Sequence, residues 1–106
     1  MKEHYFFKLI SPRPTFAQDI TDEEKRVMNQ HGQYFQQHFA EGRVLLFGPV
    51  LAREGPFGIG ILEVDDEAEA RRFAENDPSV LTGLNTFEIH PMRVSGAQGK
   101  KPEGRT

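Results

Sequence analysis

The sequence predicts an α+β domain of the ferredoxin-like class, a βαββαβ sandwich in which both helices pack on one face of a four-stranded antiparallel sheet. Three observations support this class: strand-like and helix-like segments alternate in that order, a capping box opens the longer helix, and glycine and proline separate the segments. The predicted strands are His4–Ile10, Arg43–Val50, Phe57–Val64 and Leu84–Val94, and the predicted helices run from Thr21 to Glu41 and from Glu67 to Asn76.

The first half of the chain joins a strand to the long helix. The strand is rich in aromatic and branched residues, and the segment from Ser11 to Pro14 ends it. Thr21 and Glu24 then form the capping box: the Thr21 hydroxyl accepts from the Glu24 amide, and the Glu24 carboxylate reaches back to the Thr21 amide. Gly42 provides the left-handed cap that ends the helix.

The second half contains the remaining helix between two strands. In the third strand Gly58 and Gly60 leave one face bare, so a ring, a backbone or a ligand can approach closely. Asp66 and its neighbour Asp65 cap the second helix, and Asp77-Pro78 ends it. Pro91 in the last strand indicates an edge of the sheet, because proline cannot donate to a neighbouring strand.

Size and composition limit the class of protein. The 106 residues predict one domain, residues 1–94, followed by a disordered tail, residues 95–106, that is rich in Gly, Lys and Pro. The net charge of −3, with basic residues scattered, argues against nucleic acid or an anionic membrane as a partner. No membrane span or signal peptide is predicted, and there is no cysteine, so a cytoplasmic location is expected.

The strand sequences predict a homodimer. A sheet with one solvated face should alternate apolar and polar residues, but His4–Ile10 and Arg43–Val50 are apolar on both faces. Something must cover the second face, and the simplest cover is the same face of another subunit. The expected assembly is a two-fold dimer whose stacked sheets approach a dimeric α+β barrel.

His31 and Asp77 are the candidate catalytic residues. His31 lies on the apolar stripe of the long helix and so faces inward. Asp77 lies where the second helix ends, and the helix dipole disfavours a negative charge there, so a cationic partner would be favourable. A carboxylate bound to one ring nitrogen fixes the tautomer and leaves the other nitrogen free to accept a proton. A structural account also fits: Asp77 makes a turn, and His31 is a core histidine bonded to a backbone carbonyl.

Other residues could complete a binding site for a small molecule. The candidate ligand-binding residues are Arg13, Tyr34, Phe35, Phe47, Gly48 and Pro49. Arg13 lies between two prolines and could clamp a carboxylate or phenolate, or cap a helix end. Tyr34 could donate a proton, or belong to the core with its hydroxyl at the rim. Phe35 and Phe47 would wall the site, and Gly48-Pro49 would narrow its floor or simply end the strand.

No metal and no cofactor are predicted. His31 and His38 share one helix face, but two turns, about 10 Å, separate them, which is too far to share a metal ion. His4 and His90 fit a surface pair on neighbouring strands better than a metal site. The glycines from Gly55 to Gly60 do not form a phosphate-binding loop, because no helix follows them.

An ordered set of residues also carries a family resemblance. The set is Arg13–Phe16, Glu24, His31, Tyr34, Gly42, Gly48-Pro49, Phe57-Gly58, Asp77-Pro78, Gly83 and Glu88–Pro91. From Tyr5 to Arg93 the chain resembles the YCII, or YciI-like, family. The resemblance implies a dimeric α+β barrel, a cleft between helix and sheet, and a His-Asp dyad at His31 and Asp77.

Two hypotheses for the function follow. In the first, the protein is a small cofactor-independent enzyme of the lyase or isomerase type, in which His31, oriented by Asp77, moves a proton on a small organic substrate. In the second, it is a non-catalytic dimeric module that binds a small ligand or a partner, and the His-Asp pair only ties the two helices together. The two hypotheses differ in whether His31 is needed for a reaction or for stability.

Overall fold

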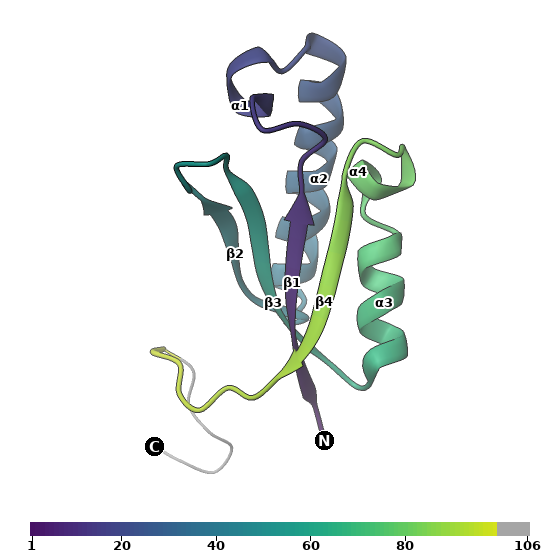
Figure 1. The fold of residues 1–106 in the computed structure, drawn as a ribbon. Coiled ribbons are helices and arrows are strands. Elements are labelled where there is room, and N and C mark those ends of the chain that lie inside the picture. Colours follow the sequence, from purple (N-terminus) through teal and green to yellow (C-terminus); the bar gives the residue numbers. More distant parts are fainter. Residues whose placement is uncertain (100–106) are drawn as a thin grey trace.

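A computed structural model describes residues 1–99 and confirms the ferredoxin-like α+β fold (Figure 1). The four strands form one sheet in the order β2-β3-β1-β4, and every neighbouring pair is antiparallel. The strands are β1 (Glu3–Ile10), β2 (Val44–Val50), β3 (Phe57–Val64) and β4 (Thr86–Met92), and the helices are α1 (Phe16–Asp19), α2 (Asp22–Ala40), α3 (Glu67–Glu75) and α4 (Pro78–Leu81).

The predicted strands and the two longer helices all form, with boundaries within two residues of the expected ones. Two short helices, α1 and α4, were not predicted from the sequence. The side chain of Phe16 is buried and anchors α1 against the core. Pro78 is the first residue of α4, a position where its missing amide hydrogen costs nothing.

The capping box at the start of α2 is present as predicted. The Glu24 amide donates to Thr21 Oγ1 at 3.1 Å, and the Thr21 amide donates to Glu24 Oε1 at 2.9 Å. The Arg13 guanidinium donates to both Glu24 carboxylate oxygens, at 2.9 and 2.7 Å, and to Asp19 at 2.7 Å. These bonds fasten the loop between β1 and α2 to the first turn of α2.

We expect this cluster to lose stability in acid. The hydrogen bonds from Arg13 lower the pKa of Glu24 from 4.5 to about 2. A carboxyl group whose pKa is lowered by folding adds stability that is complete above 4.5 and is lost as the pH falls towards 2. Thermal unfolding followed by circular dichroism should show that the Tm falls less between pH 4.5 and 2 in Glu24→Gln than in wild type. The exposed neighbour Glu23→Gln is the control, and an equal loss in wild type and Glu24→Gln would contradict the expectation.

The core lies between the sheet and helices α2 and α3, which cover the same face (Figure 1). In β1 the buried residues Tyr5, Phe7 and Leu9 alternate with less buried ones, as expected for a strand with one face inside. The Phe7 ring lies 5.3 Å from that of Phe35 on α2 and 6.2 Å from that of Phe73 on α3, measured between ring centroids. Aromatic contacts of this kind hold both helices on the sheet.

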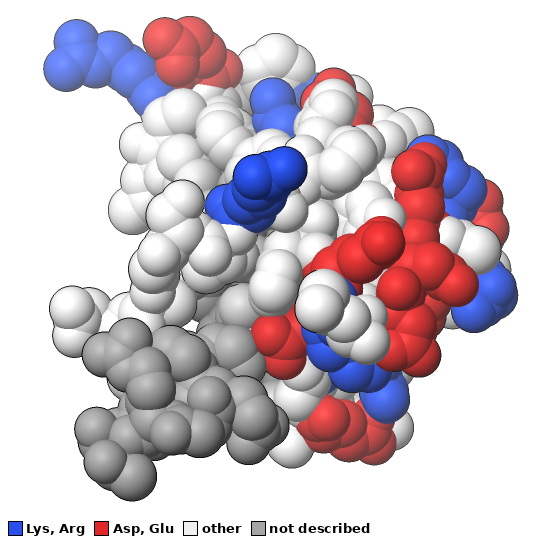
Figure 2. Space-filling view, turned by 90° about the horizontal axis from the view of Figure 1, so that it is seen from below, with Lys and Arg blue, Asp and Glu red and all other residues white. Residues whose placement is uncertain are grey.

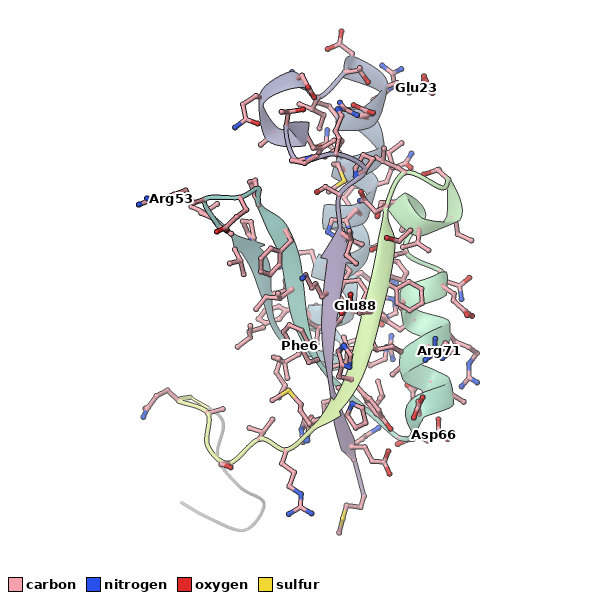
Figure 3. All side chains as sticks on the ribbon, viewed as in Figure 1. Phe6, Glu23, Arg53, Asp66, Arg71 and Glu88 are labelled. Atoms are coloured by element: carbon pink, nitrogen blue, oxygen red, sulfur yellow. The ribbon has the colours of Figure 1, made fainter. Side chains whose placement is uncertain are left out.

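The opposite face of the sheet carries many apolar side chains, as the strand sequences indicated. Phe6, Ile61 and Leu46 are register partners across three strands and point to this face, where Leu46 is 51% exposed. Charged groups are interspersed, including Glu88 on β4 (Figure 3). Strand β4, which contains Pro91, is an edge strand as predicted.

Charged side chains of both signs gather on the side of the molecule where α3 lies (Figure 2). Within residues 1–99, none of the helices has the length and apolar character needed to cross a membrane. Residues 95–99 form neither helix nor strand. The rest of the tail predicted to be disordered, residues 100–106, lies outside the described residues.

Candidate active site

His31 and Asp77, which are 46 positions apart in the chain, meet in the fold. The distance from His31 Nδ1 to Asp77 Oδ2 is 2.7 Å. The Asp77 side chain is fully buried, and that of His31 is 17% exposed. If the Asp77 carboxylate is ionised, it can only accept, so the hydrogen of this bond lies on Nδ1 and, in a neutral ring, Nε2 is the acceptor.

The surroundings of Asp77 correct one part of the sequence argument. Asp77 follows α3, but it is also the N-cap of α4: its Oδ1 accepts from the Ser79 amide at 2.8 Å and from the Ser79 hydroxyl at 3.0 Å. The carboxylate thus lies at the start of α4 as well as at the end of α3. Asp77 therefore makes the turn and binds His31 at once, and two groups of Ser79 fix its carboxylate in place. The structural account is also corrected, since the partner of His31 is this carboxylate and not a backbone carbonyl.

The second ring nitrogen of His31 is open. Within residues 1–99, Nε2 makes no hydrogen bond and is not among the buried polar atoms that lack one, so solvent reaches it. His31 lines a cavity of about 340 Å³ between α2 and the sheet. For a molecule bound beside His31, Nε2 is the candidate proton acceptor, and the hydrogen bond to Asp77 fixes the orientation of the imidazole ring.

The cavity is almost entirely apolar. Its lining residues are Phe7, Leu9, Ser11, Phe16, Met28, His31, Gly32, Phe35, Phe47, Gly48, Pro49, Pro56, Phe57, Gly58 and Ile59. Within the described part of the chain, Ser11 and His31 are the lining residues with polar side chains, and His31 is the one that can ionise. The ring of His31 lies 4.8 Å from that of Phe35, so the imidazole borders the aromatic wall. This volume and lining suit a small organic molecule.

Four of the predicted ligand-binding residues, Phe35, Phe47, Gly48 and Pro49, line this cavity together with His31. Tyr34 does not, which corrects its predicted place. Its hydroxyl points towards α3 and donates to the Phe73 carbonyl at 2.7 Å. Burial raises the pKa of Tyr34 to about 12, so this hydroxyl stays protonated and ties α2 to α3.

Arg13 is a second correction, since it lies outside the cavity lining. Its guanidinium is occupied by Asp19 and Glu24. Of its two predicted roles, the structure therefore favours support of a helix end over a clamp on a ligand. The reason is electrostatic: the carboxylates of Asp19 and Glu24 both bind the positively charged guanidinium.

Several lining residues were missed in the sequence, notably Met28, Gly32 and Phe57. Gly32 could have been predicted, because glycine destabilises the middle of a helix and its presence there indicates a packing or functional role. Ser79 was also missed, and nothing in its local sequence shows that its hydroxyl turns back to Asp77. Within residues 1–99, no three His, Asp or Glu side chains gather in a way that could hold a metal ion.

The fold and the site together define a ferredoxin-like α+β domain with a His-Asp pair beside an apolar cavity. The chain belongs to the YCII-related domain family, whose model matches residues 5–93, and this confirms the resemblance read from the sequence. Among curated proteins, none matches this sequence.

Solved structures share this fold. One is 5-chloro-2-hydroxyhydroquinone dehydrochlorinase from Burkholderia phenoliruptrix AC1100, in complex with 2,5-dihydroxybenzoquinone, with a TM-score of 0.62 and 21% identity over 84% of this chain and 93% of that chain. Another is the uncharacterized protein TM1266 from Thermotoga maritima, with a TM-score of 0.52 and 13% identity over 88% of this chain and 100% of that chain. At these identities the similarity shows the fold alone.

Proposed function

We propose that this protein is a small enzyme that moves a proton on a small organic ring or carbonyl compound without a cofactor, in a lyase or isomerase step. The observation that carries the proposal is the state of His31: one ring nitrogen is bound to the buried Asp77, the other makes no hydrogen bond and is reached by solvent, and the residue lines an apolar cavity. This arrangement suits a general base. The dehydrochlorinase of the same fold acts on a chlorinated hydroxyquinol, which is a compound of suitable size and kind.

The proposed step begins with a C–H or O–H bond of the substrate near His31. Nε2 takes the proton, and the electron pair of the broken bond forms a new double bond in the substrate. In an isomerase step, an existing double bond next to the new one shifts its electron pair to its far atom, and His31 returns the proton to that atom. In a lyase step, a group on the neighbouring carbon leaves with its own electron pair. The Asp77 carboxylate stabilises the imidazolium that exists between these events.

The lining also indicates which substrates are excluded. Within residues 1–99, no Lys or Arg lines the cavity, so a carboxylate or phosphate would lose its hydration without gaining a cationic partner. A neutral compound with a weakly acidic proton avoids this cost. Such a compound becomes negatively charged only during the reaction, when the imidazolium lies beside it.

Hydrogen–deuterium exchange tests the proposal without knowledge of the natural substrate. The protein is incubated in D₂O with small ketones and phenols, and the loss of C–H signals is followed by NMR. Wild type should accelerate exchange at carbon in at least one of these compounds. A rate equal to that in buffer for all of them would count against an enzyme that removes a proton.

We also propose that the outer face of the sheet binds a second copy of the chain. The apolar residues there, such as Phe6, Leu46 and Ile61, form a surface that the helices do not cover. Two such faces would stack in the way that sheets pack, about 10 Å apart. A second copy offers the same apolar surface in a closed two-fold arrangement.

Replacing Leu46 by glutamate should weaken this dimer. An uncompensated charge buried between two sheets is costly, so the concentration at which half of the protein is monomeric should rise by ~10-fold or more. Sedimentation velocity measures this directly. Leu81→Glu is the control, because Leu81 is 67% exposed on α4, away from the sheet face. A wild-type chain that is monomeric at micromolar concentration would contradict the proposal.

A further inference from the structure

One aromatic ring of the core packs directly on a glycine of the sheet. A Cβ atom added at Gly60 on β3 would lie 3.1 Å from Cε2 of Phe35 on α2. The Phe35 ring is itself 1% exposed, with the Phe47 ring 5.5 Å away. At this level of the fold, the space between helix and sheet is therefore the thickness of one ring, and a side chain of the protein fills it.

The next level, towards the start of both elements, borders the cavity. Helix α2 and strand β3 run in the same direction in Figure 1, so the residues before Phe35 and before Gly60 lie towards the same end of the molecule. Gly32 precedes Phe35 by about one helical turn, and Gly58 precedes Gly60 by two residues and points to the same face. Both Gly32 and Gly58 line the cavity beside His31.

The backbone does not require glycine at either position. Among residues 1–99, the glycines with positive φ are Gly42, Gly55, Gly83 and Gly99, so Gly32 and Gly58 have conformations open to any residue. A Cβ at Gly32 would meet nothing within 4 Å, and one at Gly58 would meet only the Leu9 side chain, at 3.4 Å. Alanine would therefore fit both sites, and in the middle of α2 it would favour the helix.

Gly32 also lies on the cavity side of its helix. Met28 and Phe35, four residues before it and three after it, both line the cavity, and these spacings place the three residues on one helix face. A side chain at Gly32 would enter the space that Met28 and Phe35 border. What the two glycines provide is this empty space.

We propose that Gly32 and Gly58 set the width of the cavity, and that this slot accepts one flat aromatic or quinonoid ring. The ring of the ligand would continue the row begun by Phe35 and Phe47, with His31 at its edge. This inference rests on the proposed function and deepens it, because the ring is the part of the substrate on which His31 acts.

Benzene and cyclohexane test the slot, because both are six-carbon hydrocarbons but benzene is flat and cyclohexane is thicker. Each is titrated into the isotopically labelled full-length protein, and binding is followed by NMR shifts of Phe35, Phe47 and His31. Wild type should bind benzene more tightly than cyclohexane. Gly32→Ala and Gly58→Ala should each weaken benzene binding by ~10-fold, because a methyl group would narrow the slot.

Thermal unfolding provides the second readout. Gly32→Ala should raise the Tm while weakening benzene binding, a combination that a purely structural glycine would not give. The control is Asn29→Ala on the same helix, because Asn29 is exposed and does not line the cavity. It should leave benzene binding unchanged.

Four results would each overturn the slot: no binding of benzene to wild type, cyclohexane binding as tight as benzene, undiminished benzene binding in both glycine variants, or a lower Tm for Gly32→Ala. Neither hydrocarbon has a proton that His31 can remove, so these results do not depend on catalysis. Intact benzene binding together with no deuterium exchange would refute the proposed function alone.

Discussion

Replacing His31 by alanine is expected to lower the rate of deuterium exchange by ~10²–10⁴-fold, the usual contribution of a general base. The large effect follows from the lining of the cavity, because no other ionisable side chain of residues 1–99 borders it. The assay is the same NMR experiment in D₂O, with the compound that wild type exchanges fastest.

The same variant should stay folded. Without the imidazole, the Asp77 carboxylate keeps both hydrogen bonds from Ser79 and its place as the cap of α4. Circular dichroism and thermal unfolding would establish this. If the pair is only a tie between α2 and the α3–α4 turn, His31→Ala would lose stability while exchange, measured below the Tm, continued at the wild-type rate. That outcome would favour the non-catalytic module and refute the enzyme.

Replacing Phe35 by alanine should have the largest effect on stability, ~3–5 kcal/mol. The Phe35 ring is 1% exposed and lies 5.3, 5.5 and 5.0 Å from the rings of Phe7, Phe47 and Phe73. Removing it would leave a void where α2, α3 and the sheet meet. Because a domain of this size is stable by only ~5–15 kcal/mol, a large share of the stability would be lost.

Phe39 provides a matched control for this prediction. It is the same residue type on the same helix, but it is 44% exposed and contacts the ring of Phe47 at 5.8 Å. Phe39→Ala should cost ~1 kcal/mol. Urea unfolding of the three proteins gives both values, and similar losses for Phe35→Ala and Phe39→Ala would show that the α2–sheet contact is not the centre of the core.

The elements of the fold could be predicted because their signals are local. The capping box at Thr21 and Glu24 needs only four neighbouring residues, and its two hydrogen bonds are present in the structure. The third strand, Phe57–Val64, is bounded by turn residues on both sides and forms over the predicted range. Helix α1 was missed because it depends on burial of Phe16, a contact with residues that are distant in the sequence.

The candidate site was predictable only in part, for the same physical reason. The stripe of α2 showed that His31 and Phe35 face inward, and both line the cavity. Tyr34 lies on the same stripe, but its side chain points towards α3, where the Phe73 carbonyl accepts a hydrogen bond from its hydroxyl. Which neighbour a side chain meets depends on how the helices pack, and periodicity does not contain that information.

The sequence by itself determined the order of the strands and helices, the inward face of α2 and the position of His31 on it, because hydrophobic periodicity and capping act over a few residues. Only the tertiary structure decided that Asp77 reaches His31, that Ser79 holds Asp77, and that Gly32 and Gly58 border one cavity. These contacts join segments far apart in the chain, so they exist only when α2, the α3–α4 turn and the sheet are packed together.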